Sequence, residues 1–164
     1  MRRAALAAVL LASTLAACGT ASPTVLLVRH AEKGPGRDPD LTGEGRRRAL
    51  ALIEISRQAK IEAAYHTQFR RTAQTAEPSA THLGIPLIPV EYTPGQEAEH
   101  AEALIRDIEE HFAGGTVLIV GHTTTIPAIL KKLGVETPRA IPETEYGTLF
   151  VVINGQVHEQ KFAP

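Results

Sequence analysis

Polar side chains that could bind a phosphate group or react with it follow three short apolar segments of this sequence. They are Arg29 with His30, Arg71, and His122. An arginine keeps its charge at every physiological pH and presents a fork of donors that matches tetrahedral oxygens. A neutral imidazole can attack phosphorus or donate a hydrogen bond. Two histidines and two arginines that meet at one place would therefore suit the binding and transfer of a small, dense anion.

The apolar segments before these residues have the length and composition of buried strands in a parallel sheet. They are Val25–Val28, Ile61–Tyr65 and Thr116–Val120. Because the carboxyl ends of parallel strands meet at one edge of a sheet, where ligands bind, we expect the polar groups to converge there. The first segment alone would equally fit a strand that ends in two solvated residues, and the two later segments favour a site.

Helix-forming segments alternate with these strands, which predicts an α/β protein with a three-layer α/β/α sandwich and a mainly parallel sheet. Helices are expected near residues 42–60, 68–83, 97–112 and 123–133. A further strand at residues 85–90 contains two prolines, which favour a sheet edge or a shorter strand. Residues 146–162 predict a hairpin that turns at Asn154–Gly155. The run Arg46–Arg48 indicates a solvated helix face.

The amino-terminal segment resembles an export signal, and the rest of the chain has the composition of one domain. The chain has 164 residues and a formal net charge of −1, without the basic character of a nucleic-acid-binding protein. A positive start and an apolar run precede Leu-Ala-Ala and then Cys18, which resembles a bacterial lipoprotein signal. We expect a signal peptide over residues 1–17, a tether over 18–23, and one domain over 24–164. An ordinary signal peptide that is cut at a nearby alanine is the alternative.

Three blocks of the sequence resemble the signatures of the histidine phosphatase superfamily, the phosphoglycerate mutase-like group. They are Val28–Glu32, Thr67–Ala76 and Val120–His122, and they occur in the order typical of that family. The resemblance covers nearly the whole chain after residue 23 and implies a phosphoglycerate mutase-like fold. It also implies a set of roles: His30 as the nucleophile that becomes a phosphohistidine, Arg29 and Arg71 as phosphate-binding arginines, and His122 as the second histidine of the pocket.

Further residues are expected at the site with less direct support. Thr67 stands where the family often has serine, and Thr123 follows the second pocket histidine, so both are expected to contact substrate. The family usually supplies a carboxylate that protonates the leaving group. Glu91, which directly follows residues 85–90, is the candidate for this donor, with Glu97 and Glu99 as alternatives. If the donor were absent, substrates with good leaving groups, such as phosphohistidine or a phosphoanhydride, would be favoured.

The sequence thus predicts an exported phosphomonoesterase that acts on a small phosphorylated substrate and needs no cofactor. No His-Glu-x-x-His or similar ligand spacing occurs, so no metal is expected. Cys18 would attach the protein to a membrane through a lipid. A phosphatase is favoured over a mutase because a mutase must shield its phosphoenzyme from water, and the loops here are short. A phosphohistidine-protein phosphatase and a non-catalytic lipoprotein that binds a phosphorylated ligand are the alternatives.

Overall fold

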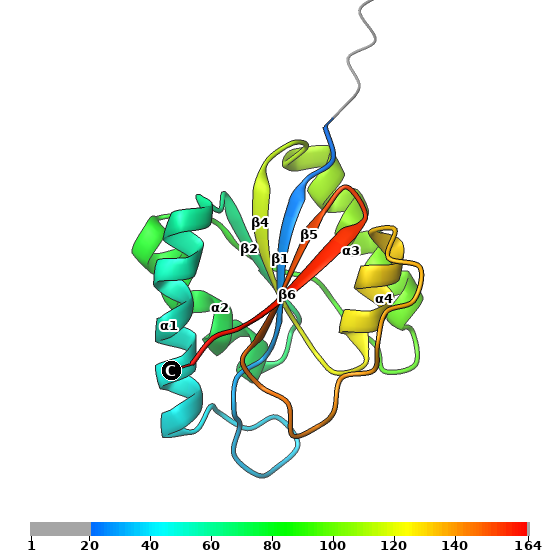
Figure 1. The fold of residues 1–164 in the computed structure, drawn as a ribbon. Coiled ribbons are helices and arrows are strands. Elements are labelled where there is room, and N and C mark those ends of the chain that lie inside the picture. Colours follow the sequence, from blue (N-terminus) through cyan, green and yellow to red (C-terminus); the bar gives the residue numbers. More distant parts are fainter. Residues whose placement is uncertain (1–20, 164) are drawn as a thin grey trace, which may run out of the picture.

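The computed structural model describes residues 21–163, in which four helices cover the two faces of a six-stranded sheet (Figure 1). The elements in chain order are β1 Thr24–Arg29, α1 Gly43–Ala59, β2 Ala63–His66, α2 Arg70–Leu83, β3 Leu87–Pro89, α3 Glu97–His111, β4 Thr116–Gly121, α4 Thr125–Lys132, β5 Thr148–Ile153 and β6 Gln156–Lys161. The expected signal peptide and Cys18 lie outside the described residues. Between residues 21 and 163, no helix combines the length and the apolar character needed to cross a membrane.

The sheet has the strand order β3-β2-β4-β1-β5-β6, and its first four strands are parallel. The hairpin β5–β6 adds to β1 in the antiparallel sense, and its turn at Asn154 and Gly155 has positive φ at both residues, as expected. The short strand β3 lies at the edge, where Pro89 does not interrupt a ladder on both sides. The structure confirms the prediction of an α/β sandwich with a mainly parallel sheet.

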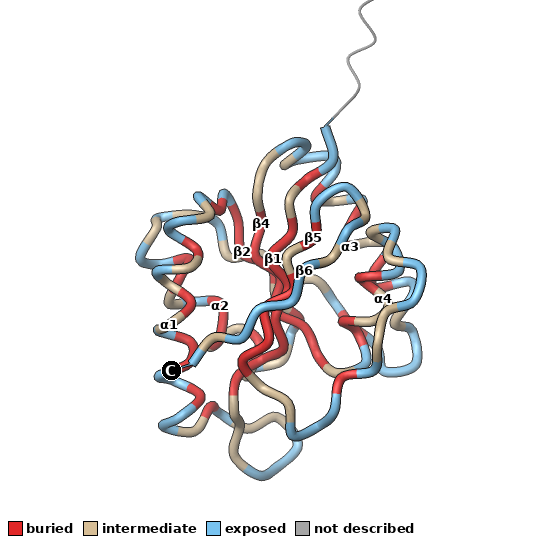
Figure 2. Tube along the Cα trace, in the orientation of Figure 1, coloured by how far each residue is buried: buried red, intermediate tan, exposed pale blue. Residues whose placement is uncertain are grey.

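Side chains of β1 alternate between two hydrophobic cores, one on each face of the sheet. Val25 and Leu27 pack with residues of α3 and α4, whereas Leu26 and Val28 pack with residues of α1 and α2. Figure 1 shows the same division, with α1 and α2 on one side of the sheet and α3 and α4 on the other. The buried stretches in Figure 2 gather along the central strands. Because β1 is covered on both faces, the position of its carboxyl end is fixed.

Helix α1 begins at a close contact with the chain segment that follows β1. The Thr42 hydroxyl caps the helix by accepting the Gly45 N–H at 3.1 Å. A Cβ atom on Gly45 would overlap the backbone of Glu32, so only glycine lets the helix approach so closely. One turn later, Arg48 Nη2 lies 2.6 Å from the Glu32 carboxylate.

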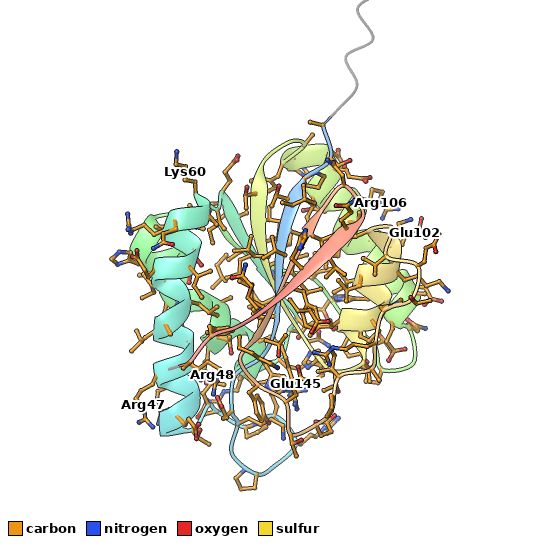
Figure 3. All side chains as sticks on the ribbon, viewed as in Figure 1. Arg47, Arg48, Lys60, Glu102, Arg106 and Glu145 are labelled. Carbon is orange, nitrogen blue, oxygen red and sulfur yellow. The ribbon has the colours of Figure 1, made fainter. Side chains whose placement is uncertain are left out.

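This contact corrects the prediction that the arginines of α1 form a solvated face. Arg46 and Arg47 are exposed, but Arg48 is buried and also donates to the Phe162 carbonyl at 3.0 Å. In Figure 3, Arg47 lies on the outer side of α1 and Arg48 on the side of the carboxyl-terminal segment. The Arg48–Glu32 pair therefore connects α1 to the loop that leaves the end of β1.

We expect Gly45→Ala to lower the free energy of unfolding by about 1–3 kcal/mol, because an added methyl group must displace backbone atoms of Glu32. Urea-induced unfolding measures the change. Gly43→Ala is the matched control, since the nearest atom to its added Cβ is Arg47 Nη1 at 3.9 Å. Equal stability of the two variants would contradict the close packing of α1 on this loop.

Candidate active site

The register of two neighbouring strands brings the two predicted histidines together at the carboxyl edge of the sheet. Arg29 at the end of β1 pairs with Gly121 at the end of β4, so His30 and His122 follow at the same level. Their ring centroids are 5.5 Å apart, and the rings meet at 63°. Both open on a cavity of about 260 Å³. Its lining consists of His30, Lys33, Phe69, Arg71, Tyr92, Pro94, His122, Thr123, Thr124 and Glu143.

His30 is held as a neutral imidazole with one nitrogen directed away from the backbone. Its Nδ1 lies 2.8 Å from the Ala31 carbonyl oxygen, which can only accept, so Nδ1 carries the proton and Nε2 keeps its lone pair. Burial lowers the pKa of His30 to about 4; the bond to Ala31 opposes this, and the charges of Arg29 and Arg71 add to it. At neutral pH, Nε2 is therefore available as a nucleophile.

Arg29 is fixed at the end of β1 by the loop that precedes β5. Its side chain is only 4% exposed, and Nη1 donates to the carbonyls of Pro142, Glu143 and Glu145 at 2.6–3.2 Å. The guanidinium carbon lies 4.3 Å from the centre of the Tyr146 ring. The Nε atom is buried and has no partner among the described residues. The guanidinium thus has a fixed position and an unused donor.

Arg71, in the first turn of α2, is the second guanidinium of the cavity. Its carbon lies 4.4 Å from the centre of the Phe69 ring, and Nη2 lies 3.4 Å from His122 Nδ1. Asp38, in the loop after β1, is 3.4 Å from Nη1, while Nε is buried with no partner within residues 21–163. A buried N–H without a partner costs about 1–3 kcal/mol. The predicted choice of Arg71 over Arg70 agrees with this placement, because Arg70 is exposed and pairs with Asp40.

His122 is held in one orientation by hydrogen bonds to both ring nitrogens. Arg71 can only donate, so Nδ1 is the acceptor, and Nε2–H donates to the Thr67 hydroxyl at 2.9 Å. The Thr67 hydroxyl also lies 2.9 Å from that of Thr72. Burial and then the charge of Arg71 lower the pKa of His122 well below its usual value. Thr67 therefore positions His122 and is absent from the cavity lining, whereas Thr123 lines the cavity as expected.

The structure does not bring the expected proton donor into the cavity. After β3, Val90 is half-buried and Tyr92 is buried, whereas Glu91 between them is exposed. Glu97 accepts the Tyr92 hydroxyl at 2.7 Å, and neither it nor Glu99 lines the cavity. Among the lining residues of the described chain, the one carboxylate is that of Glu143, which the sequence analysis did not single out.

His100 is a second residue whose place the sequence analysis missed. It is 6% exposed, its Nδ1 lies 2.9 Å from the Glu91 carbonyl, and its ring is 5.4 Å from that of Tyr92. The Tyr92 ring in turn stacks on His122 at 5.5 Å. The sequence does indicate that His100 is buried, because it lies one helical turn before Leu104, which belongs to the apolar stripe of α3.

The arrangement is suited to anions and to attack by nitrogen on phosphorus. A neutral imidazole with a free lone pair faces a cavity whose lining includes the cations Arg71 and Lys33, while Arg29 lies outside that lining and is paired with Glu143 at the rim. In the part of the chain that the structure describes, no three His, Cys, Asp or Glu side chains are grouped so that they could hold a metal ion. The positive charge at the cavity comes from Arg71 and Lys33 in its lining and from Arg29, which is paired with Glu143 at the rim.

Comparisons with known proteins agree with this geometry. Residues 25–95 match the family model of the histidine phosphatase superfamily, branch 1. Bacillus stearothermophilus YhfR is 20% identical with a TM-score of 0.65, and the alignment covers 85% of this chain and 96% of that chain. The mycobacterial glucosyl-3-phosphoglycerate phosphatase Rv2419c, in complex with inorganic phosphate, is 14% identical with a TM-score of 0.64, covering 85% and 95%.

A third solved structure, the putative phosphohistidine phosphatase SixA from Agrobacterium tumefaciens, is 21% identical with a TM-score of 0.61. The alignment covers 79% of this chain and 90% of that chain. A search of curated proteins found no match. At these identities the solved structures establish the fold, and they confirm the expected phosphoglycerate mutase-like α/β sandwich.

The buried imidazole of His30 should titrate far below an ordinary histidine. We expect its 15N chemical shifts to change with a midpoint near pH 4, against 6.5 in the urea-unfolded chain. Between these values the unfolded chain binds the proton and the folded protein does not, so the free energy of unfolding falls as the pH falls through this window. His30→Asn identifies the resonance, and a midpoint near 6.5 for His30 would refute the neutral, buried state.

Proposed function

We propose that the chain belongs to the histidine phosphatase superfamily and is a metal-independent phosphomonoesterase acting through a phosphohistidine on His30, since residues 25–95 match the model of that family and the fold matches that of similar solved structures. One observation carries the proposal. The neutral His30 faces a cavity that Arg71 lines, and Arg29 precedes His30 at the same strand end; each arginine keeps a buried Nε–H without a partner among residues 21–163. Such a pair of donors suits the equatorial oxygens of a phosphoryl group.

In the first step, the lone pair of His30 Nε2 forms a bond to phosphorus while the bond to the leaving oxygen breaks. The proton on Nδ1 stays in its hydrogen bond to the Ala31 carbonyl, so the positive charge that develops on the ring is stabilised there. Arg29 and Arg71 hold the phosphoryl oxygens and neutralise their charge throughout the transfer. The leaving oxygen takes up a proton as it departs.

In the second step, water attacks the phosphohistidine: a P–O bond forms, the water gives up a proton to solvent, the N–P bond breaks, and its electron pair returns to Nε2. The cavity suits this step because it is open to solvent: the Glu143 side chain at its rim is 77% exposed. A mutase would need to keep water away from the same intermediate. This openness supports hydrolysis over transfer to a second substrate oxygen.

Two classes of substrate are candidates for this reaction. Rv2419c is described as a glucosyl-3-phosphoglycerate phosphatase and the A. tumefaciens protein as a putative phosphohistidine phosphatase, so both a sugar-derived ester and a phosphohistidine are candidates. The export signal in the sequence favours a small ester over a phosphorelay protein, which is cytoplasmic. A binding protein without turnover is disfavoured because His30, Arg29, Arg71 and His122 are all present.

We also propose that Cys18 carries a lipid that attaches the protein to a membrane, on the strength of the sequence pattern before it. The arrangement of the described domain is compatible with such an anchor. The chain enters β1 at Thr24, at the edge of the sheet opposite to His30 (Figure 1). Because β1 has six residues, the two edges are about 20 Å apart. A lipid at Cys18 would leave the cavity on the side away from the attachment point.

We expect His30→Ala to lower kcat/KM for an aryl phosphate at least about a thousandfold, because both ring nitrogens of His122, the other histidine of the cavity, are engaged in hydrogen bonds. His158→Ala, on the exposed strand β6, is the control and should retain activity. A rapid acid-free quench should trap a phosphoenzyme that is stable in alkali only when His30 is present. Inhibition by EDTA, or activity of His30→Ala equal to the unmodified enzyme, would overturn the mechanism.

The anchor has its own test in the full chain expressed in a bacterial host. Cys18→Ser should move the protein from the membrane fraction to the soluble fraction and abolish incorporation of labelled palmitate. His158→Ala again serves as the control and should stay with the membrane. If Cys18→Ser left the distribution unchanged, the lipid-anchor proposal would fail while the phosphatase proposal stood.

A further inference from the structure

The Glu143 carboxylate at the cavity rim accepts hydrogen bonds from Arg29 and Thr123. Glu143 Oε2 accepts from Arg29 Nη2 at 2.6 Å, and Oε1 accepts from the Thr123 hydroxyl at 2.8 Å. The Glu143 side chain is 77% exposed, whereas that of Arg29 is 4% exposed. The carboxylate therefore reaches from solvent onto a buried cation beside the nucleophile.

The backbone of Glu143 is fixed although its side chain is exposed. Ile141, two residues earlier, is buried in the core formed with α3 and α4. The Glu143 carbonyl accepts from Arg29 at 2.6 Å, and Glu145, two residues later, pairs with Arg139 at 2.6 Å. With the loop held on both sides, rotation of the Glu143 side chain alone is enough to free Arg29 Nη2 and the Thr123 hydroxyl, while Arg29 Nη1 stays bound to the backbone carbonyls.

Phosphate and the Glu143 carboxylate compete for the same groups. Arg29 Nη1 is already occupied by three carbonyls, so its remaining donors are Nε and Nη2, and Glu143 holds Nη2. The hydrogen bond from Thr123 and the charge of Arg29 keep the pKa of Glu143 below its usual value, so the side chain is an anion at neutral pH. A phosphate dianion at Arg29 would stand next to this charge and be repelled by it.

We propose that Glu143 sets the affinity of this cavity for phosphate, because its carboxylate holds Arg29 and Thr123 in the empty site and must release them when phosphate binds. The inference rests on the proposed function, since it takes the cavity to be the phosphate site. The apparent dissociation constant rises as the fraction of molecules with free donors falls. When the phosphate product leaves, the carboxylate returns to Arg29 and Thr123.

The test measures binding of inorganic phosphate by titration calorimetry at neutral pH, which requires no turnover. Glu143→Gln keeps the size and an accepting oxygen but removes the charge, and we expect it to tighten phosphate binding roughly three- to tenfold. Glu136→Gln is the matched control, because Glu136 is exposed in the same loop, outside the cavity lining, and loses the same charge. It should leave the dissociation constant unchanged. Glu143→Ala should tighten binding at least as much as Glu143→Gln.

The outcomes separate this inference from the proposed function. If the unmodified protein binds phosphate and Glu143→Gln binds it equally or more weakly, Glu143 does not compete and the inference is overturned. If phosphate binding is unchanged but Glu143→Gln slows only the hydrolysis of alkyl phosphates with poor leaving groups, Glu143 is instead a proton donor, which also overturns it. If the unmodified protein neither binds nor hydrolyses phosphate compounds, the proposed function fails and the inference fails with it.

Discussion

The buried guanidinium of Arg29 is the group on which the rest of the site depends. A charge that is removed from water is tolerated only when hydrogen bonds replace the lost solvation. Three backbone carbonyls of residues 142–145 and the carboxylate of Glu143 do so here, and the Tyr146 ring covers the guanidinium. The same bonds close the loop before β5 over the end of β1. A single residue thus fixes one wall of the cavity and supplies charge to it.

The fold holds this residue and its neighbour His30 in place through packing on all sides. β1 lies inside the sheet, between β4 and β5, and contributes side chains to both hydrophobic cores. Beyond its end, the Glu32 carboxylate is bound by Arg48 of α1. Helix α1 can approach because Gly45 has no side chain. The chain is therefore restrained both before and after His30.

Much of this could be predicted from the sequence, because the main determinants are local. An apolar run followed by a polar pair identifies each strand end, and parallel pairing then brings Arg29, His30, Arg71 and His122 to one edge. Residues whose environment depends on distant contacts escaped prediction. Arg47 and Arg48 are neighbours of the same type, and only the approach of α1 to Glu32 decides which is buried.

The positions of two carboxylates near the site could not be predicted from the sequence for the same reason. Glu91 was expected at the cavity because it follows a strand, but it is exposed between the half-buried Val90 and the buried Tyr92. Glu143 comes from an irregular loop with no periodic pattern, and its place follows from the carbonyls that bind Arg29. Strand ends can be read from a sequence, whereas the path of a loop is set by the groups it must satisfy.

At this cavity, the stability of the free protein and the affinity for an anion oppose each other. Arg29 and Arg71 bring positive charge close to two histidines that burial keeps neutral, and the negative partners of the two arginines in the free protein are Glu143 and Asp38. Glu143 supplies part of this negative charge from the rim and stabilises Arg29 in the free protein. Any such stabilisation is lost when a ligand takes over the same donors, so it lowers the affinity by the same free energy. An exposed side chain on a fixed loop limits this cost, since it can leave without disturbing the carbonyls that hold Arg29.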